Sequence, residues 1–154
     1  MKRFFSGGVH PAGNKELSLS GAIVPVRPRQ VSVALQQHIG AACVPCVTVG
    51  QKVLAGEKIG DGEGLCVPVH APVSGIVRGI GPRLHVGGMV ESVVIENDMH
   101  EKETTFTPTA NKEPESILIA IREAGVVGMG GAAFPGSVKA RSSLGKADTL
   151  IANS

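Results

Sequence analysis

A glycine-rich stretch late in the chain is the segment best suited to hold a phosphorylated or flat cofactor. It reads Gly-Met-Gly-Gly-Ala-Ala-Phe-Pro-Gly over residues 128–136, and Lys139 follows it. Consecutive small residues leave backbone N–H groups uncovered, so a phosphate or a ring can come close, and the lysine adds a positive charge. The string also satisfies the Gly-x-Gly-x-x-Ala dinucleotide fingerprint, but a helix rather than a strand is expected before it. A tight-packing loop without a ligand is the plainer alternative.

Three cysteines and a histidine form a second candidate site. Two residues separate Cys43 from Cys46, and Cys66 and His70 follow further along. Three thiols and an imidazole make the ligand set of a structural Cys₃His zinc site, and a redox-active pair is a second possibility. Positions three apart on an extended strand point to opposite faces, which argues against zinc. We expect ordinary thiols and no bound metal, and keep these four residues as candidate ligands.

The composition excludes several classes of protein. The 154 residues include 15 Lys and Arg against 13 Asp and Glu, with no run of one sign and neither Trp nor Tyr. Nucleic-acid binding is therefore not expected, since it needs a basic surface and often aromatic stacking. Direct membrane insertion is not expected either, because no stretch has the apolar length of a membrane span. Three cysteines in a chain of this length fit a reducing, cytoplasmic compartment.

Short Val- and Ile-rich runs broken by Gly, Pro and Asp predict a mainly β module, built as a small barrel or sandwich. The expected strands are 22–26, 31–35, 44–49, 53–59, 65–69, 75–80 and 90–96. In the second run, the alternation predicts that Val31, Val33 and Leu35 face the core.

The character of the sequence changes after residue 97. Residues 98–113 are polar and form the best candidate linker. Pro114 at a first helical position and Gly125 at a C-terminal cap then predict a helix. The glycine-rich stretch and an apolar strand opening at Thr149 follow. We therefore expect a β-rich domain with an N-terminal extension over residues 1–97, and the incomplete start of an α/β domain over residues 114–154.

The middle of the β-rich part resembles the barrel-sandwich hybrid of lipoyl and biotinyl carrier domains. The resemblance rests on Val-Gly-Gln-Lys-Val-Leu-Ala-Gly at 49–56 and on His-Ala-Pro-Val-Ser-Gly-Ile-Val at 70–77. In the carriers, the modified lysine lies shortly before the Ala-Pro pair, at the position that Gly64 holds here. No lysine occurs from Ile59 to Val77. A barrel-sandwich hybrid fold without attached lipoyl or biotin is therefore expected.

Five motifs in order give a wider resemblance. They are Phe-Ser-Gly-Gly-Val-His-Pro at 5–11 with Asn-Lys-Glu-Leu at 14–17, Gln-His-Ile-Gly-Ala at 37–41, Pro-Val-His-Ala at 68–71 with Ser-Gly at 74–75, Val-Ile-Glu-Asn-Asp at 94–98, and Ile-Arg-Glu-Ala-Gly-Val-Val-Gly-Met-Gly-Gly-Ala-Ala-Phe-Pro at 121–135. Together they resemble the RnfC family of the Rnf electron-transport complex and its soluble relatives, including the electron-transfer protein associated with proline reductase. In that family the barrel-sandwich module precedes a domain similar to the flavin-carrying, NADH-oxidising subunit of complex I, and four-iron clusters follow.

The resemblance implies that electrons pass from NADH through FMN into iron-sulfur clusters. It also implies partner subunits, in the cytoplasm or at the cytoplasmic face of a membrane. Carried over by position, the implied flavin contacts are Gly128, Gly130, Gly131, Ala132, Phe134, Pro135, Lys139 and Asn153.

Two loop positions depart from the complex I pattern. Met129 replaces an arginine, as is usual in the Rnf branch, and Gly136 replaces a threonine whose hydroxyl could bond the flavin. Runs of Cys-x-x-Cys-x-x-Cys do not occur in these 154 residues, so the 4Fe-4S clusters are expected beyond them and the chain alone is expected to be inactive. The alternative is a stand-alone barrel-sandwich docking or adaptor module without redox activity.

Overall fold

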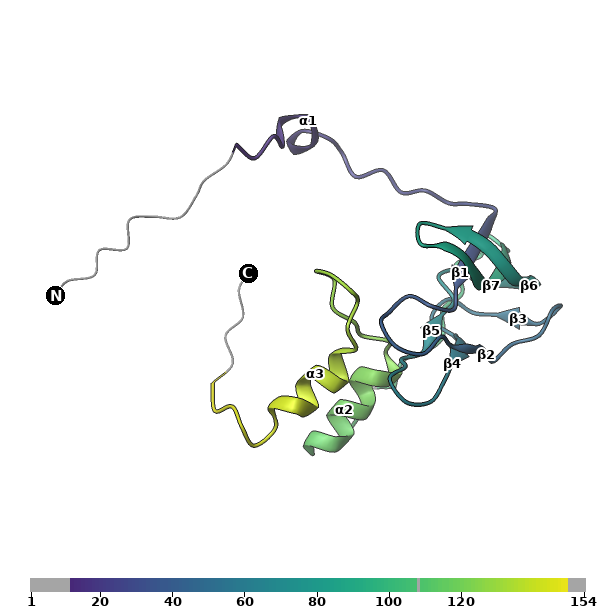
Figure 1. Ribbon diagram of the computed structural model, residues 1–154. Coiled ribbons are helices and arrows are strands. Elements are labelled where there is room, and N and C mark those ends of the chain that lie inside the picture. Colours follow the sequence, from purple (N-terminus) through teal and green to yellow (C-terminus); the bar gives the residue numbers. More distant parts are fainter. Residues whose placement is uncertain (1–11, 108, 150–154) are drawn as a thin grey trace.

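The computed structural model describes residues 12–107 and 109–149 (Figure 1). Strands predominate in the first two thirds of this part, and two helices lie together after them. In chain order the elements are α1 (Glu16–Leu19), β1 (Gln30–Ala34), β2 (Val44–Pro45), β3 (Lys52–Val53), β4 (Lys58–Asp61), β5 (Val69–His70), β6 (Gly75–His85), β7 (Gly88–Asn97), α2 (Pro114–Glu123) and α3 (Gly136–Ser143).

Two antiparallel sheets form the β-rich part. One has the strand order β1-β7-β6-β3, and the other has the order β2-β4-β5. β1 pairs with β7 along its whole length, from Gln30 opposite Glu96 to Ala34 opposite Ser92. The predicted mainly β architecture is therefore confirmed, and it is consistent with a barrel-sandwich hybrid.

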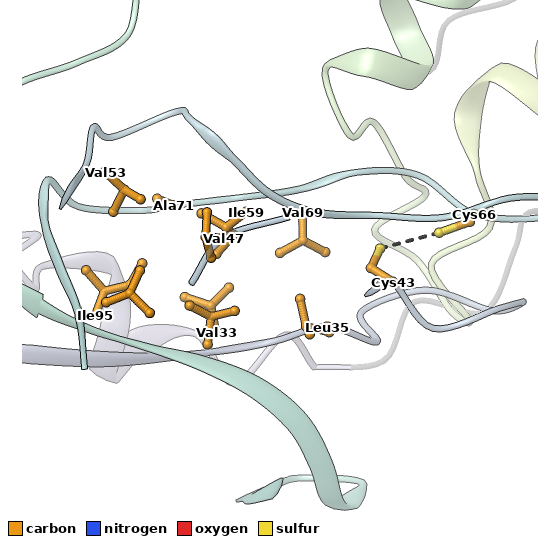
Figure 2. Packing of buried hydrophobic residues seen from close by; sticks show 12 residues of the cluster. Val33, Leu35, Cys43, Val47, Val53, Ile59, Cys66, Val69, Ala71 and Ile95 are labelled. Carbon is orange, nitrogen blue, oxygen red and sulfur yellow. Dashed lines mark hydrogen bonds between the residues drawn. The ribbon is translucent and has the colours of Figure 1, made fainter. Parts of the chain in front are cut away.

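The core lies between the two sheets (Figure 2). Val33 and Leu35 point toward Val47 and Val69 across this interior. Val33 and Leu35 are buried and Val31 packs partly buried against the same cluster, as the alternation predicts. The buried cluster consists of Val33, Leu35, Cys43, Val47, Val53, Ile59, Cys66, Val69, Ala71, Val77, Val93 and Ile95.

Several expected strands are wrong or shorter than expected. Residues 22–26 form no strand, and Ile23 is 99% exposed there. Pro25 and Pro28 lack the N–H that a neighbouring strand would use, which disfavours pairing. The expected strand 53–59 is divided between β3 and β4 by a turn at Gly56, whose φ is +82°. Residues 44–49 keep only β2, and of residues 65–69 only Val69 is in a strand.

The hairpin of β6 and β7 is longer than the sequence predicts. Gly81 and Pro82 look like strand breakers, yet pairing continues to His85 opposite Gly88. β3 pairs only with the first residues of β6, so Pro82 lies where β6 has β7 as its one described neighbour. A proline is tolerated there because its missing N–H faces no partner.

The predicted helix is confirmed as α2. It begins at Pro114, and Gly125 follows its end with a left-handed φ of +68°. A Cβ on Gly125 would lie 2.7 Å from the Pro68 carbonyl oxygen, so this glycine also lets the helix end approach the β-rich part. None of the helices over residues 12–107 and 109–149 is long and apolar enough to cross a membrane.

The polar segment after β7 begins as part of the β-rich unit. The Ala55 N–H donates to the Lys102 carbonyl at 2.9 Å, and the Thr104 N–H donates to the Ala55 carbonyl at 2.8 Å. The expected strand opening at Thr149 falls almost entirely outside the described residues.

Candidate functional site

The glycine-rich stretch forms a closed loop between α2 and α3. The Gly128 N–H donates to the Phe134 carbonyl at 2.9 Å, and the Gly136 N–H donates to the Val126 carbonyl at 2.8 Å. Pro135 is fully buried at the base of the loop. These contacts make the base a small hairpin that leads directly into α3.

The tip of this loop is open. A Cβ placed on Gly130 or on Gly131 would meet no heavy atom within 4 Å, and the Met129 side chain is 98% exposed. Ala133 holds a φ of +51°, a conformation that L-residues adopt at a cost. Because Gly130 and Gly131 have no packing role in the described chain, their uncovered backbone suits the close approach of a phosphate or a flat ring.

One backbone hydrogen bond ties the loop to the β-rich part. The Ile39 N–H donates to the Ala132 carbonyl at 3.0 Å. Ile39 follows β1 in the chain and is half-exposed. The loop is thus held from both sides, by its own hairpin base and by the segment after β1.

Lys139 lies on the exposed side of α3, one turn from its start. With Gly136 and Leu144 it lines an open hollow of about 740 Å³. The glycines at 128, 130 and 131 do not line this hollow, so the described chain does not bring all the predicted flavin contacts into one cavity. Asn153, the remaining predicted contact, lies outside the described residues.

Gly136 has a packing reason to lack the threonine side chain. A Cβ there would lie 3.0 Å from the Val126 carbonyl oxygen and 3.2 Å from Val126 Cγ1. We predict that Gly136→Thr lowers the free energy of unfolding by about 1 to 2 kcal/mol, because the added atoms crowd the loop base. Denaturant unfolding measures this, with Gly130→Thr at the open tip as the control. Equal losses in the two variants would contradict the explanation.

The four candidate metal ligands do not all come together. Cys43 and Cys66 are buried with their sulfurs 3.3 Å apart, whereas Cys46 is exposed and contacts the Val44 carbonyl through its thiol. His70 lies on β5, with its ring beside Gly125 at the end of α2.

A different histidine joins the two buried thiols. The ligand atoms of His38, Cys43 and Cys66 all lie within 4.8 Å of one another. The cysteine spacing gives no hint of His38, because the two loops meet only in the folded chain.

The hydrogen bonds of His38 do not fit a metal ligand. The Val67 N–H donates to His38 Nε2 at 3.2 Å, and Nδ1 lies 3.0 Å from the Ile39 carbonyl oxygen. Nε2 is then the acceptor and Nδ1 the donor, so no lone pair is free for a cation. Burial, followed by the contact with Cys66, raises the pKa of the Cys43 thiol to about 12. The pair is therefore a neutral dithiol as it stands.

The end of β4 and the end of α2 are joined by an ionic cluster. Arg122 donates to Asp61 Oδ1 at 2.6 Å and to the Gly62 carbonyl at 2.8 Å. Lys58 bonds Asp61 Oδ2 at 2.9 Å and also contacts Glu123. Burial alone would raise the pKa of Asp61, but hydrogen bonds from Arg122, Lys58 and Gly62 outweigh it and hold this pKa at about 2. The cluster fixes α2 against the β-rich part.

The position of the carrier lysine is equally clear. Gly64 is exposed between β4 and β5, with a φ of +70°. Lys58 is the nearest lysine before it in the chain, and it belongs to the ionic cluster.

Residues 3–100 match the family model described as the RnfC Barrel sandwich hybrid domain. The chain belongs to the RnfC family. It is 37% identical to the RnfC-type subunit of the ion-translocating oxidoreductase complex of Yersinia enterocolitica, over 97% of this chain and 22% of that protein. The proteins of the same name in Salmonella arizonae and Vibrio cholerae are also 37% identical, over 97% of this chain and 23% and 20% of their lengths. The resemblance seen in the five ordered motifs is therefore confirmed.

The RnfC-type chain spans only about a fifth of the length of these curated relatives. The family model ends before α2, whereas the alignments with the relatives cover nearly all of the chain.

Proposed function

We propose that this RnfC-type chain belongs to the electron-accepting subunit of an ion-translocating oxidoreductase complex. The single observation that supports a cofactor role best is the open loop tip at Gly130 and Gly131, which is held in place by Ile39 and by its own hairpin base. The names of the relatives support membership of a multi-subunit complex. Bound FMN would supply hydride acceptance from NADH and one-electron release toward 4Fe-4S clusters outside these 154 residues.

The residues of this chain would bind and orient the flavin. Backbone N–H groups at the loop tip would meet its phosphate or its ring edge, and the Lys139 ammonium would add a positive charge nearby. Phe134, which is 42% exposed, offers an apolar surface for a flat ring. Gly128, Ala132 and Pro135 would shape the loop, and Asn153 would approach the flavin from the following strand.

The division of labour along the chain follows from this proposal. Residues 1–97 would form the barrel-sandwich unit that contacts partner subunits, and residues 98–113 would connect it to an α/β unit starting at 114. The complex would place the protein at the cytoplasmic face of a membrane through those partners. A role for the β-rich unit in docking needs no lipoyl or biotin group.

Flavin titration of the whole subunit tests the loop directly. We expect Gly131→Val and Lys139→Met each to weaken FMN binding roughly tenfold or more, which corresponds to about 1.4 kcal/mol. The first variant covers the open backbone without an internal clash, and the second removes the charge. Quenching of flavin fluorescence measures both dissociation constants.

Matched controls separate binding from folding. Gly87→Val places the same side chain at another open glycine, and Lys112→Met removes another exposed lysine. Both controls should bind FMN like the unchanged subunit. A subunit that melts cooperatively without flavin and shows no difference between variants and controls would instead favour the docking module.

A further inference from the structure

The two buried thiols are held together by the backbone around them. The Ala41 N–H donates to the Leu65 carbonyl at 3.0 Å, and the Cys43 N–H donates to the Leu35 carbonyl at 2.8 Å. Gly40 adopts a φ of +118° against Leu65, where a Cβ would lie 2.1 Å from the carbonyl oxygen. The loops that carry Cys43 and Cys66 are therefore already in register, and the sulfurs meet without any strand separating.

Access to the two sulfurs is unequal. Cys66 lines a small hollow of about 140 Å³ between the β-rich part and the helices, together with Leu118, Arg122 and Arg141. Cys43 does not line it and lies behind Cys66. The two guanidinium groups favour a thiolate at Cys66, although each is also paired with a carboxylate. Burial raises the pKa of Cys43, which keeps that thiol protonated until Cys66 has reacted.

We propose that Cys66 and Cys43 form a peroxide-oxidisable pair that closes to an intramolecular disulfide. The Cys66 thiolate attacks one oxygen of hydrogen peroxide, the O–O bond breaks, and a sulfenic acid and hydroxide result. The Cys43 sulfur then attacks the Cys66 sulfur, the S–S bond forms, and the hydroxyl leaves as water with the Cys43 proton. In total, two thiols and one hydrogen peroxide give one disulfide and two waters.

The size of the hollow selects the oxidant. A liquid water molecule occupies about 30 Å³, so a cavity of 140 Å³ admits hydrogen peroxide but not the bulk of oxidised glutathione. Exposed Cys46 has no such restriction. The two oxidants should therefore choose different cysteines of the same chain, with peroxide acting at Cys66 and the large disulfide at Cys46.

The crosslink would sit next to the glycine loop. It would fix the segment that contains His38 and Ile39, and the Ile39 N–H holds the Ala132 carbonyl of that loop. Oxidation would thus act on the segment that supports the loop, without touching the loop itself.

Peptide mapping of the full chain tests the pairing. The reduced, metal-free chain is treated with equimolar hydrogen peroxide, alkylated in denaturant and digested with trypsin. We expect a disulfide joining the peptides 30–52 and 59–78, which contain Cys43 with Cys46 and Cys66 respectively. Because the first peptide holds two cysteines, Cys46→Ser is the matched control and should crosslink at the same rate.

Three results would overturn the proposal. One is loss of the crosslink in Cys46→Ser, and a second is its persistence in Cys43→Ala. The third is a purified chain that holds about one zinc ion and whose buried thiols resist both peroxide and alkylation, which would make the group a metal site. With oxidised glutathione, we expect Cys46 to react at least roughly tenfold faster than Cys66, and the reverse order with peroxide.

A thermal measurement guards against a variant that fails to fold. In the Cys46→Ser chain, peroxide treatment should raise the melting temperature by several degrees, and dithiothreitol should reverse the shift. The same treatment should leave the Cys43→Ala chain without a reversible shift. No reversible shift in Cys46→Ser, or an equal shift in both chains, would count against a crosslink between these two residues.

Discussion

Gly75→Ala is expected to unfold the β-rich part of the chain. An added Cβ would lie 1.9 Å from the Glu96 carbonyl oxygen and 2.8 Å from the Glu96 carbonyl carbon. Gly75 is paired on one side with Asn97 of β7 and on the other with Val53 of β3, so the backbone cannot retreat. We expect the free energy of unfolding to fall by about 3 kcal/mol or more, a large share of the stability of a small domain.

Gly81 on the same strand provides the control. A Cβ there would meet no heavy atom within 4 Å, although Gly81 is also paired with β7. Gly81→Ala should therefore change the free energy of unfolding by no more than about 0.5 kcal/mol. Guanidinium unfolding followed by far-UV circular dichroism measures both. Similar midpoints for the two variants would show that the contact with Glu96 does not constrain the fold.

The elements that the sequence predicts well carry their own local signals. The alternation from Val31 to Leu35 predicts both β1 and its buried face, and Pro114 with Gly125 predicts both ends of α2. The strand expected at 22–26 has apolar residues but no neighbour to pair with. Whether an apolar run becomes a strand depends on a partner elsewhere in the chain, and no local pattern reports that partner.

The same division holds for the candidate sites. The small residues of the glycine loop are visible in the sequence, but its bond from Ile39 to Ala132 joins residues far apart in the chain. The Cys-x-x-Cys spacing is misleading, because the folded chain pairs Cys43 with Cys66 instead of Cys46. Short spacings suggest contacts along the chain, whereas these contacts are made by loops that two different sheets position.

Arg122→Met is expected to loosen α2 from the β-rich part. The substitution keeps most of the apolar length of the side chain but removes the hydrogen bonds to Asp61, Gly62 and Glu123. Asp61 is only 26% exposed and would keep Lys58 as its partner. We expect the free energy of unfolding to fall by about 2 to 3 kcal/mol, the range for hydrogen bonds to a partly buried charge. Arg141→Met, which removes the exposed pair with Glu115, is the control and should leave the unfolding midpoint unchanged.

The effect of Arg122→Met should depend on pH in a direction that the cluster sets. The pKa of Asp61 is about 2 in the folded chain, below the value of about 3.9 for an unfolded aspartate. A carboxylate with a depressed folded pKa stabilises the fold above its unfolded pKa, and this contribution is lost as the pH falls through the folded pKa. The difference between the unchanged chain and Arg122→Met should therefore be full at neutral pH and shrink between about pH 4 and about pH 2. A difference that stays constant to the acid end would mean that Arg122 acts through packing and its bond to the Gly62 carbonyl, because neither of these titrates in that range.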